Sequence, residues 1–193
     1  MCRTDYLTLL TEAHEFTLRN FYGETSCNSI GLRLKQYDDA SIREACKSVQ
    51  TMLAAVHPSF ICNKCLFICL GVNRLLLDRN FRPILTTGYV LLNHSEKEYY
   101  TDRKELLRQF KDIQHPMNLQ FHVWLTIGEY IMDPTYITTH CILNPDTYPR
   151  QDSYDNKIVL FKHTSELFKF GNNTLEYIPQ LTGTLPFERI MSL

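Results

Sequence analysis

The sequence lacks the features that mark several large classes of protein. Its 193 residues carry a formal net charge of −1, so we expect no general electrostatic attraction to nucleic acid or to an anionic membrane. No apolar run approaches the roughly 20 residues that a helix needs to span a bilayer. The first residues show no basic region followed by an apolar core, so no Sec-type signal is expected. Neither a nucleic-acid partner nor a membrane span is therefore predicted.

The chain also contains no internal repeat, no low-complexity segment and no linker that would separate two domains. Hydrophobic residues make up 44% of the chain and charged residues 21%, which are ordinary globular values and argue against disorder. A chain of this length fits one domain. We therefore expect a single domain over residues 1–193, with its core at about residues 40–178.

The cysteines do not read as a disulfide framework, because their number is odd and no signal is evident. A reducing compartment is the better interpretation, so we expect a cytoplasmic protein, or one exported like an effector without a Sec signal. In that setting most cysteines are small buried hydrophobic residues. The seven are Cys2, Cys27, Cys46, Cys62, Cys65, Cys69 and Cys141.

Hydrophobic spacing and turn residues predict an α+β fold. Helices are expected over residues 6–20, 41–57, 65–77 and 102–113. Ser41 and Glu44 have the spacing of a capping box, which places the start of the second helix at Ser41. Strands are expected over residues 82–93, 119–127, 130–133, 157–162 and 174–178. Residues 138–156 contain Pro145 and Pro149 and are expected to form a long loop.

Three residues in this framework have the chemistry of a sulfur nucleophile and its base. Cys65 opens an apolar helix, His122 lies in an alternating strand, and Asp133 follows the next turn. A thiol at a helix start lies near the positive end of the helix dipole and near free backbone amides, which favour the thiolate. The same amides can hold an oxyanion, which is usually the largest catalytic term.

The hairpin between the histidine and the aspartate predicts how these two residues meet. Gly128-Glu129 is a two-residue turn of the Gly-X kind, which suits a type II′ turn. With that register His122 and Asp133 share a face as diagonal neighbours, about 7–8 Å apart at the backbone. A carboxylate that binds one ring nitrogen leaves the other free to take a proton, as a general base does.

These segments also carry a set of motifs in a characteristic order. Cys65 is followed by a leucine-rich helix body, a short turn and a strand with Gly88-Tyr89. His122-Val123-Trp124-Leu125 has the form His-x-Trp followed by an apolar residue, and Asp133-Pro134-Thr135 follows it. In this order the motifs resemble the transglutaminase-like superfamily, over roughly residues 65–136.

The resemblance implies a papain-like fold, in which a nucleophile helix packs on an antiparallel β-sheet. It implies a catalytic triad of Cys65, His122 and Asp133 that forms a thioester with a carboxamide or peptide carbonyl. A protein or peptide substrate is expected, with an amine as second substrate when the acyl group is transferred, and no metal or organic cofactor is needed. Deamidation or transamidation of protein glutamine is the favoured reaction. A cysteine protease, including a peptide-maturation protease, would use the same intermediate.

Two further residues are candidates for the walls of such a site. Asn63, two residues before the nucleophile, is a candidate oxyanion donor, and Ser59 is the alternative for that role. Trp124 is the only tryptophan and either lines the cleft beside His122 or packs in the core.

Less specific interpretations stay open. Cys65 alone would be read as a core cysteine, and Cys62 with Cys65 forms a C-x-x-C pair, which also occurs in redox and zinc sites. Asp133 can cap the turn at Pro134 instead of orienting a histidine. His140-Cys141 either lines the cleft or belongs to an ordinary loop. The whole domain could also be an inactive binding module that keeps the fold.

Overall fold

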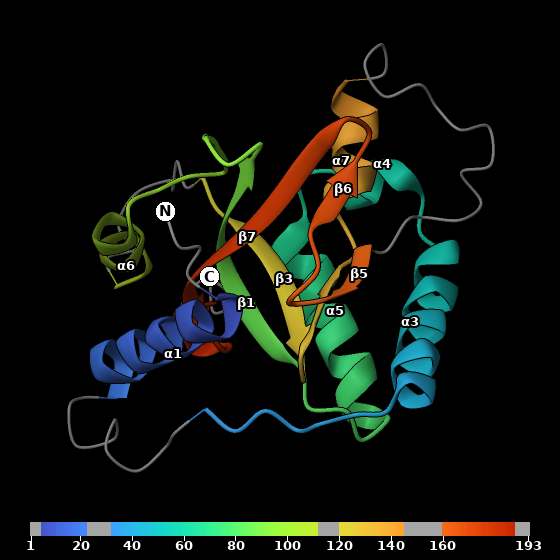
Figure 1. Cartoon of the computed structure of the whole chain (residues 1–193), viewed down its shortest axis with the longest axis horizontal. Coiled ribbons are helices and arrows are strands. Elements are labelled where there is room, and N and C mark those ends of the chain that lie inside the picture. Colours follow the sequence, from blue (N-terminus) through green and yellow to red (C-terminus); the bar gives the residue numbers. More distant parts are fainter. Residues whose placement is uncertain (1–4, 23–31, 112–119, 145–159, 188–193) are drawn as a thin grey trace.

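A computed structural model describes residues 5–22, 32–111, 120–144 and 160–187. Within these residues seven antiparallel strands form one sheet with the order β5-β4-β3-β1-β7-β6 (Figure 1). The seventh strand, β2, pairs with the C-terminal end of β1. The strands are β1 Ile84–Leu92, β2 Glu96–Glu98, β3 His122–Ile127, β4 Tyr130–Asp133, β5 Leu160–His163, β6 Phe168–Phe170 and β7 Asn173–Thr182. The helices are α1 Tyr6–Tyr22, α3 Asp39–Ala54, α4 Pro58–Ile61, α5 Cys65–Asp78, α6 Arg103–Lys111 and α7 Tyr136–Leu143. The α+β class with an antiparallel sheet is as expected.

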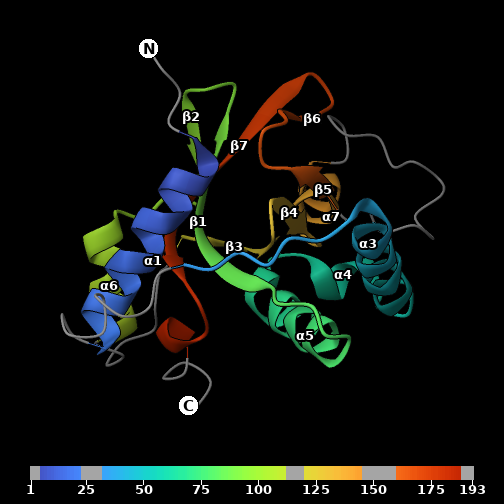
Figure 2. The same cartoon turned by 60° about the horizontal axis from the view of Figure 1, so that its bottom comes forward.

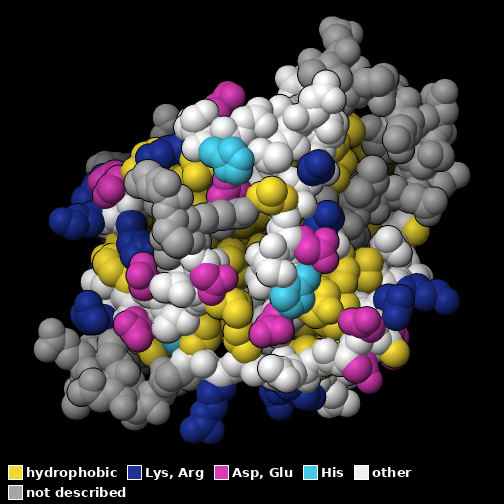
Figure 3. Space-filling model, in the orientation of Figure 1, with side chains coloured by type: hydrophobic (Ala, Val, Ile, Leu, Met, Phe, Trp, Pro, Cys, Tyr) yellow, Lys and Arg dark blue, Asp and Glu magenta, His cyan; other side chains and the backbone are white. Residues whose placement is uncertain are grey.

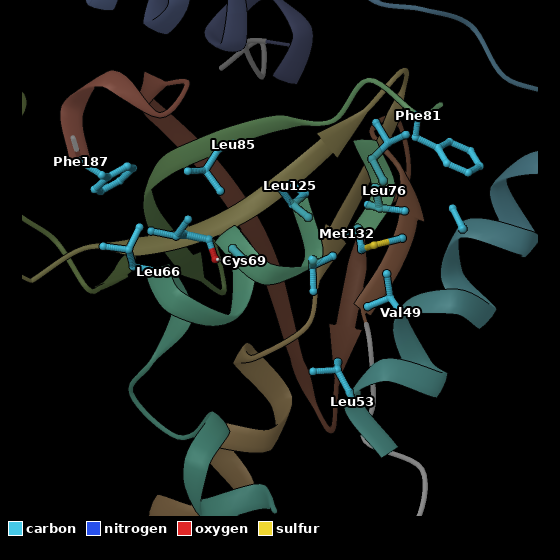
Figure 4. Packing of buried hydrophobic residues seen from close by; sticks show 14 of the residues in the cluster. Val49, Leu53, Leu66, Cys69, Leu76, Phe81, Leu85, Leu125, Met132 and Phe187 are labelled. Carbon is cyan, nitrogen blue, oxygen red and sulfur yellow. Dashed lines mark hydrogen bonds between the residues drawn. The ribbon is translucent and has the colours of Figure 1, made fainter. Parts of the chain in front are cut away.

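One face of the sheet is covered by α5, with α3 beside it (Figure 2). Leu66, Cys69 and Leu76 of α5 point toward side chains of β1, β3 and β4, and α3 adds Val49 and Leu53 (Figure 4). Each fully buried leucine or valine contributes about 1.5–3 kcal/mol relative to an exposed one. This cluster therefore fixes the position of α5, the helix that begins at Cys65.

The opposite face of the sheet is covered by α1 (Figure 2). Tyr6 and Leu10 of α1 pack in a second buried cluster with Trp124 of β3 and Tyr177 of β7. All six residues of β3 are buried, because helices cover both faces of the sheet at this strand. Trp124 is therefore a core residue and does not line a cleft, so that alternative is wrong.

The β3–β4 hairpin has the predicted register. Ile127 pairs with Tyr130, and Leu125 pairs with Met132. Gly128 has φ of +57°, the sign that a type II′ turn requires at its first central position. A one-residue slip would turn every side chain of the strand to the other face, so this turn decides where His122 points.

Two helix starts differ from the sequence prediction. The N-cap of α3 is Asp38, whose side chain accepts a hydrogen bond from the Ser41 amide at 2.8 Å, so the helix begins ahead of the expected capping box. Pro58 does not simply end a helix, because it is the first residue of the short helix α4. A proline suits that position, where its missing N–H would have no partner in any case.

Helix α7 occupies part of the segment that was expected to be a loop, and that expectation is wrong for residues 138–143. Its residues from Tyr136 to Cys141 are all buried, so the sequence shows no amphipathic period. The Asp133 carboxylate accepts hydrogen bonds from the amides of Thr135 and Tyr136 at the start of this helix. The prolines at 145 and 149 lie outside the described residues.

Charge on the surface is mixed. On the face in Figure 3, acidic and basic side chains lie among exposed hydrophobic areas, without a large area of either charge. Among the described residues, no helix is both long and apolar enough to cross a membrane.

Candidate active site

Cys65 is the first residue of α5 and is half-buried. A tight turn from Ile61 to Lys64 delivers it, closed by a hydrogen bond from the Lys64 amide to the Ile61 carbonyl at 3.1 Å. Asn63 has φ of +57° at the third position of this turn, a conformation that asparagine adopts more easily than most residues. In the described part of the chain no side chain caps this helix start. The first helical amides therefore lie beside the sulfur with no side-chain partner.

His122 and Asp133 meet as the hairpin register predicts. His122 Nε2 lies 2.5 Å from Asp133 Oδ2, and both side chains are buried, at 3% and 0% exposure. The other ring nitrogen, Nδ1, is left for a second partner. The Cys65 side chain lies close enough to the imidazole to contribute to the raised pKa of His122, so the structure brings all three predicted residues together.

Asp133 accepts hydrogen bonds from other groups in addition to His122. Its Oδ1 accepts from the amides of Thr135 at 2.9 Å and Tyr136 at 3.0 Å, while its Oδ2 also accepts from the Tyr177 hydroxyl at 2.7 Å. The capping role and the orienting role of Asp133 were alternatives in the sequence. The structure shows both, one for each carboxylate oxygen.

The buried pair is charged. Burial by itself lowers the pKa of His122, but the charge of Asp133, its hydrogen bond and the contact with Cys65 together raise that pKa above its usual range. Burial raises the pKa of Asp133, yet the His122 charge and the hydrogen bonds from His122, Thr135 and Tyr177 hold it below its usual range. An imidazolium next to the Cys65 sulfur is therefore favoured at neutral pH.

The other described cysteines differ from Cys65. Cys69 is fully buried and its thiol donates to the Val123 carbonyl at 3.2 Å. Burial raises the pKa of the Cys46, Cys62 and Cys69 thiols, which keeps them in the unreactive thiol form. Cys65, in contrast, lies at a helix start and contributes to the raised pKa of His122.

Trp124 and Asn63, the two candidates for the walls of the site, lie in different environments. Trp124 is fully buried, and its Nε1–H donates to the Tyr6 hydroxyl at 2.9 Å. Its ring lies 6.0 Å from that of His122, so it packs behind the imidazole. Asn63 is exposed next to the nucleophile, and its backbone amide donates to Thr139 Oγ1 at 3.4 Å.

His140 and Cys141 lie on α7 and not in a loop. His140 Nε2 lies 3.2 Å from Glu98 Oε2, and the Tyr136 hydroxyl donates to the same oxygen at 2.5 Å. His140 therefore lies near the site, where it contacts Glu98 together with Tyr136.

Sequence reasoning missed three residues around the imidazole. Tyr99 stacks on the His122 ring at 5.2 Å between centroids, Glu98 precedes it, and Tyr177 holds Asp133 from β7. Glu98 and Tyr99 lie between the strand predicted over residues 82–93 and the helix predicted over residues 102–113, where the sequence predicted no element. The available signal in the sequence was Asn93, because asparagine favours turns. In the structure Asn93 and His94 both have positive φ angles, and the turn folds this segment back on β1 as a hairpin.

The described residues contain no group of three His, Cys, Asp or Glu side chains placed to hold a metal ion. No family model matches the chain, and neither a curated protein nor a solved structure shows significant similarity to it. Only the geometry of the site therefore bears on the function of the protein.

Proposed function

We propose that the protein is a cysteine-dependent acyl-transfer enzyme with Cys65 as nucleophile, His122 as acid and base, and Asp133 as the residue that orients His122. One observation carries this proposal: a buried imidazole binds a carboxylate through Nε2 and lies near a cysteine at a helix start, which contributes to its raised pKa. A papain-like arrangement of the transglutaminase-like kind is the fold that we infer, because the nucleophile helix packs against the strand that carries the histidine.

The reaction follows from the positions of these groups. The Cys65 thiolate attacks the carbon of a carboxamide or peptide bond, and the imidazolium of His122 gives its proton to the leaving nitrogen. The C–N bond breaks and a thioester remains. Water or an amine then attacks the thioester, loses a proton to His122 and releases the Cys65 thiolate.

The oxyanion of each tetrahedral intermediate needs donors near the sulfur. The backbone amide of Cys65 at the uncapped start of α5 is one donor, and the exposed Asn63 side chain is a candidate for a second. Removing one such donor typically costs about 100- to 1,000-fold in rate. Glutamine deamidation or transamidation on a protein is the reaction that we favour, and proteolysis through the same thioester is the second candidate.

The thiol's reactivity tests the proposal without knowledge of the substrate. We expect iodoacetamide to label Cys65 rapidly below pH 7, because the imidazolium stabilises the thiolate. The labelling should slow about 10- to 100-fold in His122→Ala. Peptide mass spectrometry follows each cysteine against pH, with the half-buried Cys46 of α3 as an internal control.

Equal labelling rates for Cys65 and Cys46 would contradict the catalytic interpretation and favour an inactive binding module. As a second test, p-nitrophenyl acetate should acylate Cys65 and leave Cys65→Ser unmodified. Intact-protein mass spectrometry detects the acyl adduct directly.

A further inference from the structure

Glu98 is a charged group beside the triad to which the proposed reaction gives no role. Strand β2 pairs with β1 and brings Glu98 to α7, where Oε2 accepts from the Tyr136 hydroxyl at 2.5 Å and lies 3.2 Å from His140 Nε2. Both contacts use one carboxylate oxygen and fix the orientation of the group.

The other oxygen is open. Glu98 Oε1 accepts no hydrogen bond from the residues that the structure describes, and the Glu98 side chain is 19% exposed to solvent. Burial raises the pKa of Glu98, but the contacts with His140 and Tyr136 and the charges of His140 and His122 hold it below its usual range. The carboxylate is therefore charged at neutral pH, oriented, and reachable from solvent.

Aromatic side chains lie next to this carboxylate and connect it to His122. The Tyr99 ring lies 6.4 Å from both the Tyr136 and the His140 rings, and it stacks on His122. Tyr99 has φ of +56°, which costs a non-glycine residue about 1–2 kcal/mol. Such strain is typical of functional sites. A carboxylate with aromatic side chains close by favours an organic cation, through charge and through cation–π attraction.

We propose that Glu98 binds the ammonium group of a primary alkylamine that acts as acyl acceptor for the thioester on Cys65. This inference rests on the proposed function and selects its second substrate, so it favours transamidation over hydrolysis. The attacking nitrogen first loses a proton to water and becomes a neutral amine. It then forms the C–N bond and gives a second proton to His122, while the C–S bond breaks and Cys65 leaves as the thiolate.

The partition of one acyl-enzyme tests this proposal. p-Nitrophenyl acetate acylates Cys65, and mass spectrometry then measures the ratio of acetylated amine to free acetate. The cationic acceptors are cadaverine and Nα-acetyl-lysine amide, and hydroxylamine is the acceptor that is neutral at pH 7. Because both products arise from the same thioester, the ratio does not depend on how fast the thioester forms.

We expect Glu98→Gln to lower the ratio about ten-fold for the cationic acceptors and less than about two-fold for hydroxylamine. Glutamine keeps an oxygen for Tyr136 but removes the charge. Glu176→Gln is the matched control, because Glu176 is another mostly buried, histidine-paired carboxylate, in β7, and its loss should leave every ratio unchanged. Tyr136→Phe keeps the charge and should keep the preference for cations.

Each outcome separates the two proposals. A larger loss with the lysine amide identifies a peptide lysine as the acceptor, and a larger loss with cadaverine identifies a free diamine. An unchanged ratio in a Glu98→Gln protein that still acylates would overturn the amine site and leave the acyl-transfer proposal standing. Failure of the wild type to acylate at Cys65 would overturn both.

Discussion

At the scale of single residues, Asp133 shows how a buried charge is held in one orientation. It is fully buried and accepts hydrogen bonds from His122, from two amides at the start of α7 and from the Tyr177 hydroxyl. A buried carboxylate is tolerated only when its charge is balanced and its oxygens are bonded. The same bonds that make Asp133 acceptable in the core also fix the direction in which His122 points.

Tyr177→Phe tests one of these bonds. We expect the free energy of unfolding to fall by about 1.5–3 kcal/mol, because a hydrogen bond to a buried charged group is lost. The pKa of Asp133 should rise, since that bond stabilises the ionised form. Urea unfolding and carboxyl NMR titration measure the two effects.

Tyr130→Phe is the control, because the Tyr130 hydroxyl donates to Asp39 in an exposed hydrogen bond at 3.1 Å. Its removal should change stability by less than about 0.5 kcal/mol. Equal effects of the two substitutions would contradict the account of Asp133.

At the scale of elements, the contact of β1 with β7 explains why the Gly-Tyr motif needs its glycine. The pairing of these strands shifts register between Thr87 and Gly88. A Cβ at Gly88 would lie 2.0 Å from the Ile178 carbonyl oxygen and 2.9 Å from the Trp124 ring. The glycine lets the strands approach closely beside His122, which pairs with Gly88 on the other edge of β1.

Gly88→Ala should therefore destabilise the protein by about 3 kcal/mol or more, because the clash is with backbone that cannot move aside. Gly71→Ala in α5 is the matched control, since a Cβ at Gly71 meets nothing within 4 Å. That change should stabilise the helix by up to about 1 kcal/mol. Thermal unfolding of both variants would show opposite shifts, and a neutral Gly88→Ala would contradict the close approach.

Helix α7 connects the parts of the site to one another. Asp133 caps its start, Thr139 accepts from the amide of Asn63 next to the nucleophile, and Tyr136 and His140 hold Glu98. One short helix thus contacts the hairpin, the nucleophile turn and the β2 segment. Small displacements of α7 would move all three groups relative to one another.

At the scale of the whole molecule, His122 and Asp133 lie on strands of a sheet that is covered on both faces, and both side chains are buried. The ionisation of this pair is therefore coupled to folding. The raised pKa of His122 adds stability that is fully present below about pH 6.5 and is lost as the pH rises through the folded-state value. The lowered pKa of Asp133 adds stability above about pH 4 that is lost as the pH falls. The pair therefore stabilises the fold most between about pH 4 and pH 6.5.

Asp133→Asn tests this coupling when it is compared with its parent in a Cys65→Ser background, which removes the nearby thiol. We expect the difference in unfolding free energy to be largest in that window and to shrink on both sides. Above pH 6.5 it should shrink by at most about 1.4 kcal/mol per pH unit. Urea unfolding across the pH range measures the difference, and a constant difference would contradict a charged buried pair.

Several features could be predicted from the sequence because local patterns encode them. The apolar run after Cys65 predicts α5, and the Gly128-Glu129 turn predicts a register that places His122 beside Asp133. Helix α7, the burial of Trp124 and the roles of Glu98 and Tyr99 could not be predicted in this way. Each depends on contacts between segments far apart in the chain, such as Trp124 with Tyr6 or Glu98 with His140.

The sequence by itself determined which residues carry the proposed chemistry, because a helix start, a strand and a two-residue turn are fixed by local hydrogen bonds and hydrophobic spacing. Only the tertiary structure decided that Cys65 lies near His122, that Tyr177 binds Asp133, and that the segment after β1 returns to place Glu98 against α7 and Tyr99 on the imidazole. These are long-range contacts, and they form only when α1 and α5 cover the two faces of the sheet and bury the groups that must then find partners.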